Sequence, residues 1–190
     1  MTLALQLAWL ALPLVVSGLV HLAVMKYDWL PALRARPMDF GATLRGRRVF
    51  GDNKTWRGAF VTVGTVTASA WLLSRSGFAW FGEPSLVPWA DAHPVIWGLL
   101  LGGGYILGEL PNSFLKRQLG IAPGANAAGL EGRTFWVVDQ LDSLAGILAC
   151  TWSVWHPSPT LVALLVAAML VGHPLAAWVM VRTGLKRRVG

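Results

Sequence analysis

Two uncharged, apolar stretches at opposite ends of the chain constrain its fold more than any other feature. Residues 3–24 and 160–181 contain no Asp, Glu, Lys or Arg, and each is long enough to cross a hydrocarbon core, which takes about 20 residues of helix. The chain is 55% hydrophobic and only 13% charged, with a mean hydropathy of +0.54. That apolar content exceeds what soluble domains carry, so the sequence predicts a protein that spans a membrane.

Three further segments, at residues 58–73, 95–110 and 135–155, are shorter or are interrupted by acids. Such segments suit helices that other helices shield from lipid. The stretch 3–24 has no basic segment before it and no A-x-A-like cleavage site near Lys26, so we expect a retained anchor rather than a signal peptide. The 11 Trp residues are typical of an aromatic belt at the membrane interfaces. The sequence therefore predicts a single all-α integral membrane domain over residues 1–190, with about five transmembrane helices.

The basic residues indicate how these helices cross the membrane. All but one of the 16 Lys and Arg residues fall in the segments 26–57 and 111–134 or in the C-terminal tail. They are Lys26, Arg34, Arg36, Arg45, Arg47, Arg48, Lys54, Arg57, Lys116, Arg117, Arg133, Arg182, Lys186, Arg187 and Arg188. Only Arg75 falls on the other side, so the positive-inside rule predicts the N-terminus outside and the C-terminus inside, with an odd number of spans. We expect a multi-pass protein of the cell membrane. The net charge of +7 reflects this topology, and we expect no nucleic-acid partner.

Two acids at membrane depth, Asp139 and Asp142, need an explanation because charged groups are costly there. They are three residues apart, which on a helix places both on one face, about 5–6 Å apart at their Cβ atoms. Two carboxylates so placed repel each other unless a positive charge lies between them. Their hard oxygen atoms, with phosphate nearby, favour Mg²⁺, bound as one or two ions. The alternative is that these acids pair with Arg133 or cap the start of their helix.

A second group of ionisable and polar residues follows the third predicted span. Glu109 precedes Asn112 and Ser113, and Lys116 and Arg117 come directly after them. Glu109 is a candidate third metal ligand, although its place near a span end also lets it reach the interface. Lys116 and Arg117 are candidate phosphate-binding residues.

The segment before the second predicted span interleaves cations, small residues and hydrogen-bonding side chains: Asp52, Asn53, Lys54, Thr55 and Arg57. Lys54 and Thr55 come too late after Gly46 and Gly51 to form a P-loop, and no strand precedes them. We interpret the segment as a flexible loop that binds phosphate oxygens, with Thr55 as the N-cap of the next helix. The alternative is an ordinary basic loop that holds anionic lipid headgroups.

Glycines four residues apart occur twice in the third predicted span, at Gly98 and Gly102 and at Gly104 and Gly108. Small residues at this spacing allow close approach of two helix backbones. The pattern is the same for packing within one chain and for packing across a homodimer. The single cysteine, Cys150, excludes an internal disulfide.

Three blocks in this order make the chain resemble the CDP-archaeol synthase family, whose members are membrane cytidylyltransferases related to phosphatidate cytidylyltransferase. The blocks are Gly51-Asp-Asn-Lys-Thr-Trp-Arg-Gly58, Ser113-Phe-Leu-Lys-Arg-Gln-Leu-Gly-Ile-Ala-Pro-Gly124 and Asp139-Gln-Leu-Asp142. Together they extend the resemblance over most of the chain. One departure is Glu109, where the family tends to have aspartate before the Ser-Phe-x-Lys-Arg block.

The resemblance implies that a lipid phosphate attacks the α-phosphorus of CTP, releasing pyrophosphate and leaving a CDP-activated lipid. Its implied partners are CTP, a phosphatidate-like or archaetidic-acid-like lipid, and Mg²⁺, with the site on the cytoplasmic side. The implied catalytic residues are Asp139, Asp142, Lys116 and Arg117. The implied substrate-binding residues are Asp52, Asn53, Lys54, Thr55, Arg57, Asn112 and Ser113.

Two other classes of protein remain open. A transporter or channel would line its path with intramembrane acids, but the sequence has no pair of matching halves. A lipid kinase or another lipid phosphotransferase would also use metal-bound carboxylates. A CDP-alcohol phosphotransferase would carry an Asp-Gly-x-x-Ala-Arg run, which this sequence lacks.

Overall fold

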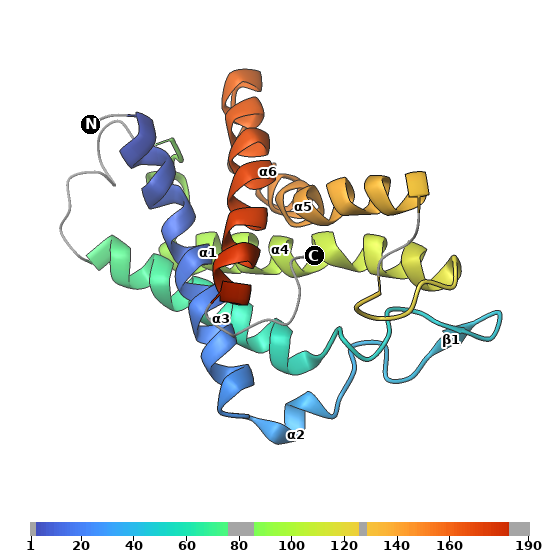
Figure 1. Ribbon diagram of the computed structural model, residues 1–190. Coiled ribbons are helices and arrows are strands. Elements are labelled where there is room, and N and C mark those ends of the chain that lie inside the picture. Colours follow the sequence, from blue (N-terminus) through green and yellow to red (C-terminus); the bar gives the residue numbers. More distant parts are fainter. Residues whose placement is uncertain (1–2, 76–85, 126–128, 183–190) are drawn as a thin grey trace.

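The computed structural model describes residues 3–75, 86–125 and 129–182 (Figure 1). Its long helices are α1 (Leu3–Lys26), α3 (Trp56–Arg75), α4 (Pro94–Gln118), α5 (Gly129–Thr151) and α6 (Pro159–Arg182). A short helix, α2 (Pro31–Arg34), and a hairpin of two strands, β1 (Thr43–Leu44) and β2 (Arg47–Arg48), connect α1 to α3. A 3-10 turn, η2 (Trp89–Asp91), precedes α4.

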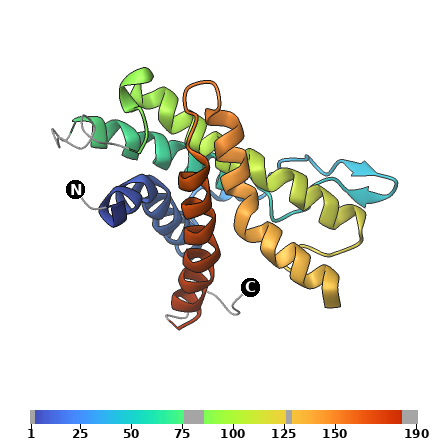
Figure 2. The ribbon, with the colours of Figure 1, turned by 90° about the horizontal axis from the view of Figure 1, so that it is seen from above.

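Helix α4 is the centre of the arrangement. It lies lengthwise between α3 and α5, while α1 packs across α3 and α6 leaves the end of α5 at a steep angle (Figures 1 and 2). The core contains Trp97 and Val66, which are fully buried, and includes Ile147 of α5. Trp89 meets the ring of Trp97 edge-on, with 5.3 Å between the ring centroids. The large aromatic and aliphatic side chains thus join α3, α4 and α5 into one packed unit.

Four of the five predicted spans fall within a long helix, and the prediction of a helix is confirmed there. The fourth, residues 135–155, is helical only to Thr151, where α5 ends. The ends differ most at α4, which the sequence analysis ended at residue 110 and which continues through Pro111 to Gln118. Proline in a helix interior removes one N–H donor and crowds the carbonyl four residues earlier, but α4 continues past Pro111. As a result Asn112 and Lys116 lie on the last turns of α4 rather than in a loop.

The small hairpin is the departure from an all-α chain in the described ranges.

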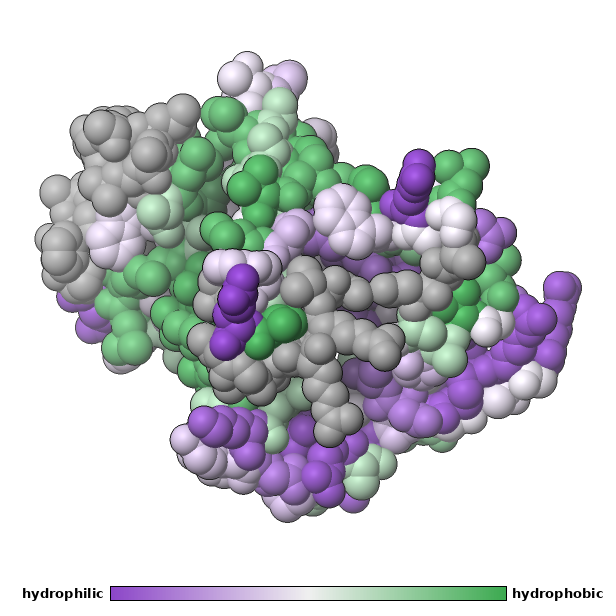
Figure 3. Space-filling model, in the orientation of Figure 1, coloured by the Kyte–Doolittle hydropathy of each residue, from purple (hydrophilic) through white to green (hydrophobic). Residues whose placement is uncertain are grey.

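Among the residues that the structure describes, one helical segment is long and apolar enough to cross a membrane by length and composition alone, Gln6–Lys26 of α1. The apolar part of α6, Pro159–Gly172, is shorter. Hydrophobic surface covers α1 and α6, and hydrophilic surface gathers where the hairpin lies (Figure 3). The number of spans and their orientation stay predictions.

The two glycine pairs of α4 contact different neighbours within the same chain. A Cβ atom at Gly98 would clash with Thr67 of α3, and one at Gly102 would lie 2.9 Å from Val63 Cα. On the other side, a Cβ atom at Gly104 would lie 2.8 Å from the carbonyl oxygen of Gly146 in α5. Both motifs are therefore accounted for by packing inside one chain, and they give no support to a homodimer.

Gly108 completes the contact with α5, because a Cβ atom there would clash with the carbonyl oxygen of Asp142. We expect Gly108→Ala to lower the free energy of unfolding by about 1–3 kcal/mol, as overpacking does, although alanine is the better helix former by about 1 kcal/mol. Gly103→Ala is the matched control, since a Cβ atom at Gly103 meets nothing within 4 Å. Thermal unfolding in detergent measures both. Equal melting temperatures for the two variants would contradict this packing of α4 on α5.

Candidate active site

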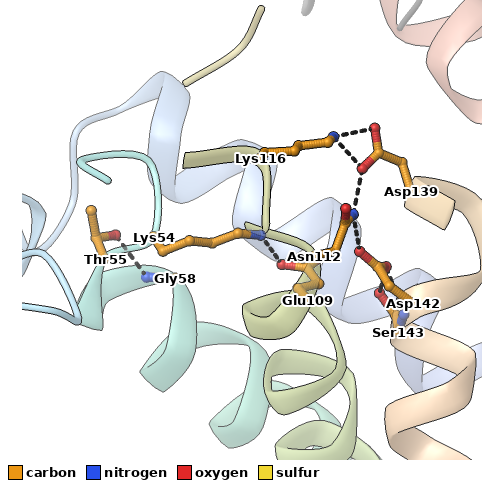
Figure 4. A network of polar contacts seen from close by, with 9 residues as sticks. All are labelled: Lys54, Thr55, Gly58, Glu109, Asn112, Lys116, Asp139, Asp142 and Ser143. Atoms are coloured by element: carbon orange, nitrogen blue, oxygen red, sulfur yellow. Dashed lines mark hydrogen bonds and ion pairs between the residues drawn. The ribbon is translucent and has the colours of Figure 1, made fainter. Parts of the chain in front are cut away.

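Asp139 and Asp142 of α5 are held together by one side chain of α4. The Asn112 amide nitrogen Nδ2 donates to Oδ1 of Asp139 at 2.6 Å and to Oδ2 of Asp142 at 2.7 Å (Figure 4). The second oxygen of Asp142 accepts from the backbone N–H of Ser143 at 2.7 Å. The two carboxylates thus face α4 from one side of α5, as their spacing predicts, and the amide fixes their relative position.

Lys116 lies one helical turn beyond Asn112 on the same face of α4. Its Nζ forms an ion pair with both oxygens of Asp139, at 2.6 Å for Oδ2, and lies 5.5 Å from the centre of the Phe135 ring. The lysine side chain is only 14% exposed. The Asp139 side chain is 37% exposed, so the pair is partly shielded from water.

A third contact joins the loop before α3 to α4. Lys54 forms an ion pair with Glu109, and both side chains are about one-fifth exposed (Figure 4). Thr55 Oγ1 accepts from the backbone N–H of Gly58 at 3.3 Å, which confirms the prediction that Thr55 is the N-cap of α3. The capping residue therefore fixes where the loop ends and where Lys54 points.

Asp39 accepts hydrogen bonds from several groups of the same loop, and the sequence analysis did not identify it. Its Oδ2 accepts from the backbone N–H groups of Phe50 and Gly51 at 2.9 and 3.0 Å. Its Oδ1 accepts from Arg48 at 2.6 Å and from the N–H of Gly41 at 3.0 Å. The bond from Gly41, two residues on, is an Asx turn, and the Asp-x-Gly order at residues 39–41 was the sequence signal for it.

The position of Asp39 also sets its charge state. Burial raises the pKa of this carboxyl, but the Arg48 guanidinium and the three backbone N–H groups outweigh burial and hold the pKa well below its usual value. The carboxylate is therefore ionised at neutral pH and keeps its hydrogen bonds to the loop. Next to this loop, the backbone N–H of Met38 donates to the carbonyl oxygen of Lys54 at 2.7 Å, so Asp39 and Lys54 belong to one hydrogen-bonded unit.

Arg117 is buried beneath this unit. The residue is 7% exposed, and its Nε and Nη1 atoms are buried without a hydrogen-bond partner in the described part of the chain. Gly51, whose φ of 90° favours glycine, packs over it, since a Cβ atom there would lie 3.4 Å from Arg117 Cδ and 3.1 Å from Pro123 Cγ. A buried guanidinium with free donors is suited to an anion.

Other predicted site residues lie apart from the carboxylates. Arg57 forms an ion pair with Asp28 at 2.8 Å, and Asp52 forms one with Arg48 at 2.6 Å and is 79% exposed. Asn53 is exposed, and Ser113 is buried next to Asn112. The structure thus brings together Asn112, Lys116, Asp139 and Asp142, adds the pair of Lys54 with Glu109, and leaves Asp52, Asn53 and Arg57 at the periphery.

The donor set fits a divalent cation with oxygen ligands. Among the described residues, no group of three or more His, Cys, Asp or Glu side chains is arranged to hold a metal ion. The candidate ligands are the oxygens of Asp139 and Asp142, which accept hydrogen bonds from Lys116, Asn112 and Ser143. A further candidate is Oδ1 of Asn112, which is buried and has no hydrogen-bond partner. Carboxylate and amide oxygens are the ligands that hard cations take. Glu109, the third predicted ligand, is turned to Lys54.

One lysine–carboxylate pair joins α4 to α5, and another joins the loop before α3 to α4. Such groups among apolar helices are typical of the functional sites of membrane proteins. Comparison with known proteins identifies the family. The model of CarS-like proteins, the CDP-archaeol synthases, matches residues 2–189, and the chain belongs to this family.

Individual relatives agree with this assignment. A CDP-archaeol synthase of Pyrococcus furiosus is 38% identical over 145 residues, which covers 75% of this chain and 74% of the relative. One from Methanospirillum hungatei is 33% identical over 139 residues, 71% of this chain and 76% of the relative. The solved structure of an intramembrane enzyme for archaeal membrane lipids biosynthesis is similar with a TM-score of 0.62 and 26% identity, over 92% of this chain and 94% of that chain.

The role of Asp39 can be tested by its pH dependence. Because its pKa is lower in the folded chain than in the unfolded chain, its carboxylate contributes stability above the unfolded pKa of about 4, and this contribution is lost as the pH falls further. We expect Asp39→Asn to lower the free energy of unfolding at pH 7 by about 1–3 kcal/mol. The difference from the unmodified protein should shrink below about pH 4.

Asp52→Asn is the control, because Asp52 pairs with the same arginine in solvent, where an ion pair contributes at most about 1 kcal/mol. Thermal unfolding from pH 7 to pH 3 measures all three proteins. A difference between Asp39→Asn and the unmodified protein that stays constant over this range would contradict the assigned charge.

Proposed function

We propose that this protein transfers a cytidylyl group from CTP to a membrane lipid phosphate, giving a CDP-activated lipid and pyrophosphate. Membership of the CDP-archaeol synthase family supports the reaction. The observation that carries the site is the bridge of Asn112 between Asp139 and Asp142, with Lys116 on the same aspartate. Paired carboxylates next to cations are what a metal-assisted transfer between phosphates needs.

The lysines hold the phosphates of the two substrates. Lys116 and Lys54 each bond to a carboxylate of the cluster, and a phosphate oxygen can replace that carboxylate without leaving an unpaired buried charge. Such an exchange at Lys116 frees Asp139, which with Asp142 would bind Mg²⁺, as one or two ions. The metal supplies neutralisation of the triphosphate and polarisation of the α-phosphoryl group.

Arg117 and Asn112 complete the binding of substrate. The free donors of the Arg117 guanidinium give a bidentate contact to phosphate that a lysine cannot make. Oδ1 of Asn112 is available to a cation, and Ser113 can donate a hydrogen bond. Asp52, Asn53, Thr55 and Arg57 form the outer wall of the nucleotide site.

No side chain needs to act as nucleophile. The lipid phosphate is already an anion near neutral pH, since the second pKa of a phosphate monoester is about 6. Its oxygen attacks the α-phosphorus of CTP, a bond to that phosphorus forms, and the bond to the pyrophosphate oxygen breaks. The residues of this chain therefore contribute orientation and charge rather than a base.

We propose further that the site faces the cytoplasm in a multi-pass protein with its N-terminus outside. The basic loop before α3 lies beside the polar C-terminal end of α4 and the polar N-terminal half of α5. CTP and Mg²⁺ are cytoplasmic. The lipid is phosphatidate or an archaetidic-acid-like ether lipid.

The product distinguishes this reaction from its alternatives. Purified protein with Mg²⁺ and each of the four nucleoside triphosphates is offered phosphatidate or an archaetidic-acid analogue. We expect pyrophosphate and a CDP-lipid from CTP. Formation of ADP from ATP would indicate a lipid kinase, CMP from a CDP-lipid would indicate a phosphotransferase, and no turnover of any nucleotide would favour a transporter.

We expect Asp139→Asn and Asp142→Asn each to lower kcat by 100-fold or more, which is roughly the loss that follows removal of one charge-stabilising group. Asp91→Asn is the control, because Asp91 lies in η2, before the opposite end of α4. Turnover and circular dichroism are measured on the same preparations. Near-normal turnover by both site variants would remove the two aspartates from the reaction.

Lys116 gives a separate test of phosphate binding. We expect Lys116→Ala to lower kcat/KM by at least about 10-fold, the equivalent of one charged hydrogen bond, and Lys116→Arg to retain more of it. Kinetics at varied CTP and at varied lipid assign the lysine to one substrate. Unchanged constants in Lys116→Ala would leave it only a structural role.

A further inference from the structure

The turn of the hairpin holds Arg45, a residue with a long side chain, in a strained backbone conformation. Its two-residue turn consists of Arg45 and Gly46, with φ of 53° and 75°, between Leu44 and Arg47, which pair across the strands. Two positive φ values suit Asn or Gly, and a long side chain such as that of arginine is rare there. Non-glycine residues held in this region often have a functional reason.

A hollow of about 580 Å³ opens between the hairpin and the last turns of α4. We call it the hairpin hollow, and its lining residues are Leu44, Arg45, Arg47, Phe114 and Gln118. Phe114 is two positions from both Asn112 and Lys116, which places it on the opposite side of the helix at 100° per residue. The hairpin hollow is therefore separate from the carboxylates of the candidate active site.

The lining combines positive charge with apolar surface. Arg45 is exposed and forms no hydrogen bond or ion pair with any residue that the structure describes. Arg47 donates to the backbone carbonyl oxygen of Gln118, which ties the hairpin to α4. No acid lines the hairpin hollow, so no lining residue neutralises the positive charges of Arg45 and Arg47.

Exposed apolar side chains also occur close in sequence to the hairpin and directly beside two lining residues of α4. Phe40 is 74% exposed, and Leu115 and Leu119 on α4 are 53% and 58% exposed. Exposed aromatic and aliphatic groups beside arginines are typical of protein surfaces that lie in the headgroup region of a bilayer. A nucleotide has no hydrocarbon to pack against these apolar side chains, whereas a phospholipid has both a phosphate and a hydrocarbon end.

We propose that the hairpin hollow binds the headgroup phosphate of an anionic membrane phospholipid that is not the substrate, through Arg45 and Arg47. The glycerol end of this lipid lies against Leu44 and Phe114. The proposal rests on the membrane location of the chain and not on its reaction.

Occupation of the hairpin hollow also affects the loop that carries Lys54. Arg47 is followed in β2 by Arg48, which holds Asp39 at 2.6 Å, and Asp39 in turn bonds to the backbone of Gly51. A lipid that fixes the hairpin against the membrane therefore restrains this loop. We expect a non-substrate anionic lipid to raise activity.

The test uses the full-length protein in neutral detergent, titrated with phosphatidylglycerol or phosphatidylcholine, with lipid retention read by native mass spectrometry. We expect the unmodified protein to retain phosphatidylglycerol in preference, and Arg45→Gln to lose roughly 5-fold in that affinity, the contribution of one arginine at an anionic surface. Arg36→Gln is the control, because Arg36 is an exposed arginine of the same loop and its substitution removes the same charge.

A second variant separates lipid binding from stability. Arg45→Gly removes the guanidinium and also relieves the positive φ, so we expect the same loss of lipid together with a melting temperature higher by about 2 °C. Neither substitution should change cytidylyl transfer to the lipid-phosphate substrate in neutral detergent that contains no phosphatidylglycerol. Activation by phosphatidylglycerol should disappear in both.

Three outcomes overturn the proposal. The first is equal retention of phosphatidylglycerol by Arg45→Gln and the unmodified protein. The second is displacement of the lipid by millimolar inorganic phosphate, which would make the site one for free phosphate. The third is a higher KM for CTP in Arg45→Gln, which would assign the hairpin hollow to the nucleotide. If the unmodified protein shows no cytidylyl transfer, the retention measurement still decides the lipid site.

Discussion

The close approach of α4 and α5 is the constraint on which the candidate site depends. Gly104 and Gly108 on α4 and Gly146 on α5 bring the two backbones together so closely that no side chain fits between them. Only at such a distance can the short side chain of Asn112 reach two carboxylates on the facing helix. Small residues at a helix interface therefore act here on chemistry as well as on packing.

Charge compensation is the second condition. Three acids and two lysines lie in a partly buried region, where an unpaired charge costs several kcal/mol. Lys116 with Asp139 and Lys54 with Glu109 satisfy each other, while Asn112 covers one oxygen of Asp142. In the proposed reaction each lysine would exchange its carboxylate for a phosphate oxygen of a substrate.

The sequence predicted the helices well because hydrophobic segments of that length are helical in a membrane. It also predicted that Asp139 and Asp142 share a face, which follows from helical spacing alone. The position of Asn112 between them could not be predicted, because it depends on the register of α4 against α5. For the same reason the sequence placed Arg57 near the phosphates, whereas the structure pairs it with Asp28.

The loop between α1 and α3 shows a different limit. Hydropathy carries no information on a hairpin of two residues per strand, and the loop was predicted to be flexible. The structure instead orders it around one buried carboxylate, Asp39, with bonds to Arg48 and to three backbone N–H groups. Arg48, Phe50 and Gly51 contact Asp39 although they lie nine to twelve residues away in sequence. The sequence pattern could therefore have indicated only the Asx turn at Asp39.

In the proposed mechanism Asp139 and Asp142 jointly hold a divalent cation beside phosphate. Binding of Mn²⁺, a paramagnetic substitute for Mg²⁺, to the full-length protein with CTP present can be followed by electron paramagnetic resonance. The account predicts that Asp139→Asn and Asp142→Asn each weaken Mn²⁺ binding by at least about 10-fold, since even residues that only orient metal ligands contribute that much. Mn²⁺ bound by both variants as tightly as by the unmodified protein would contradict it.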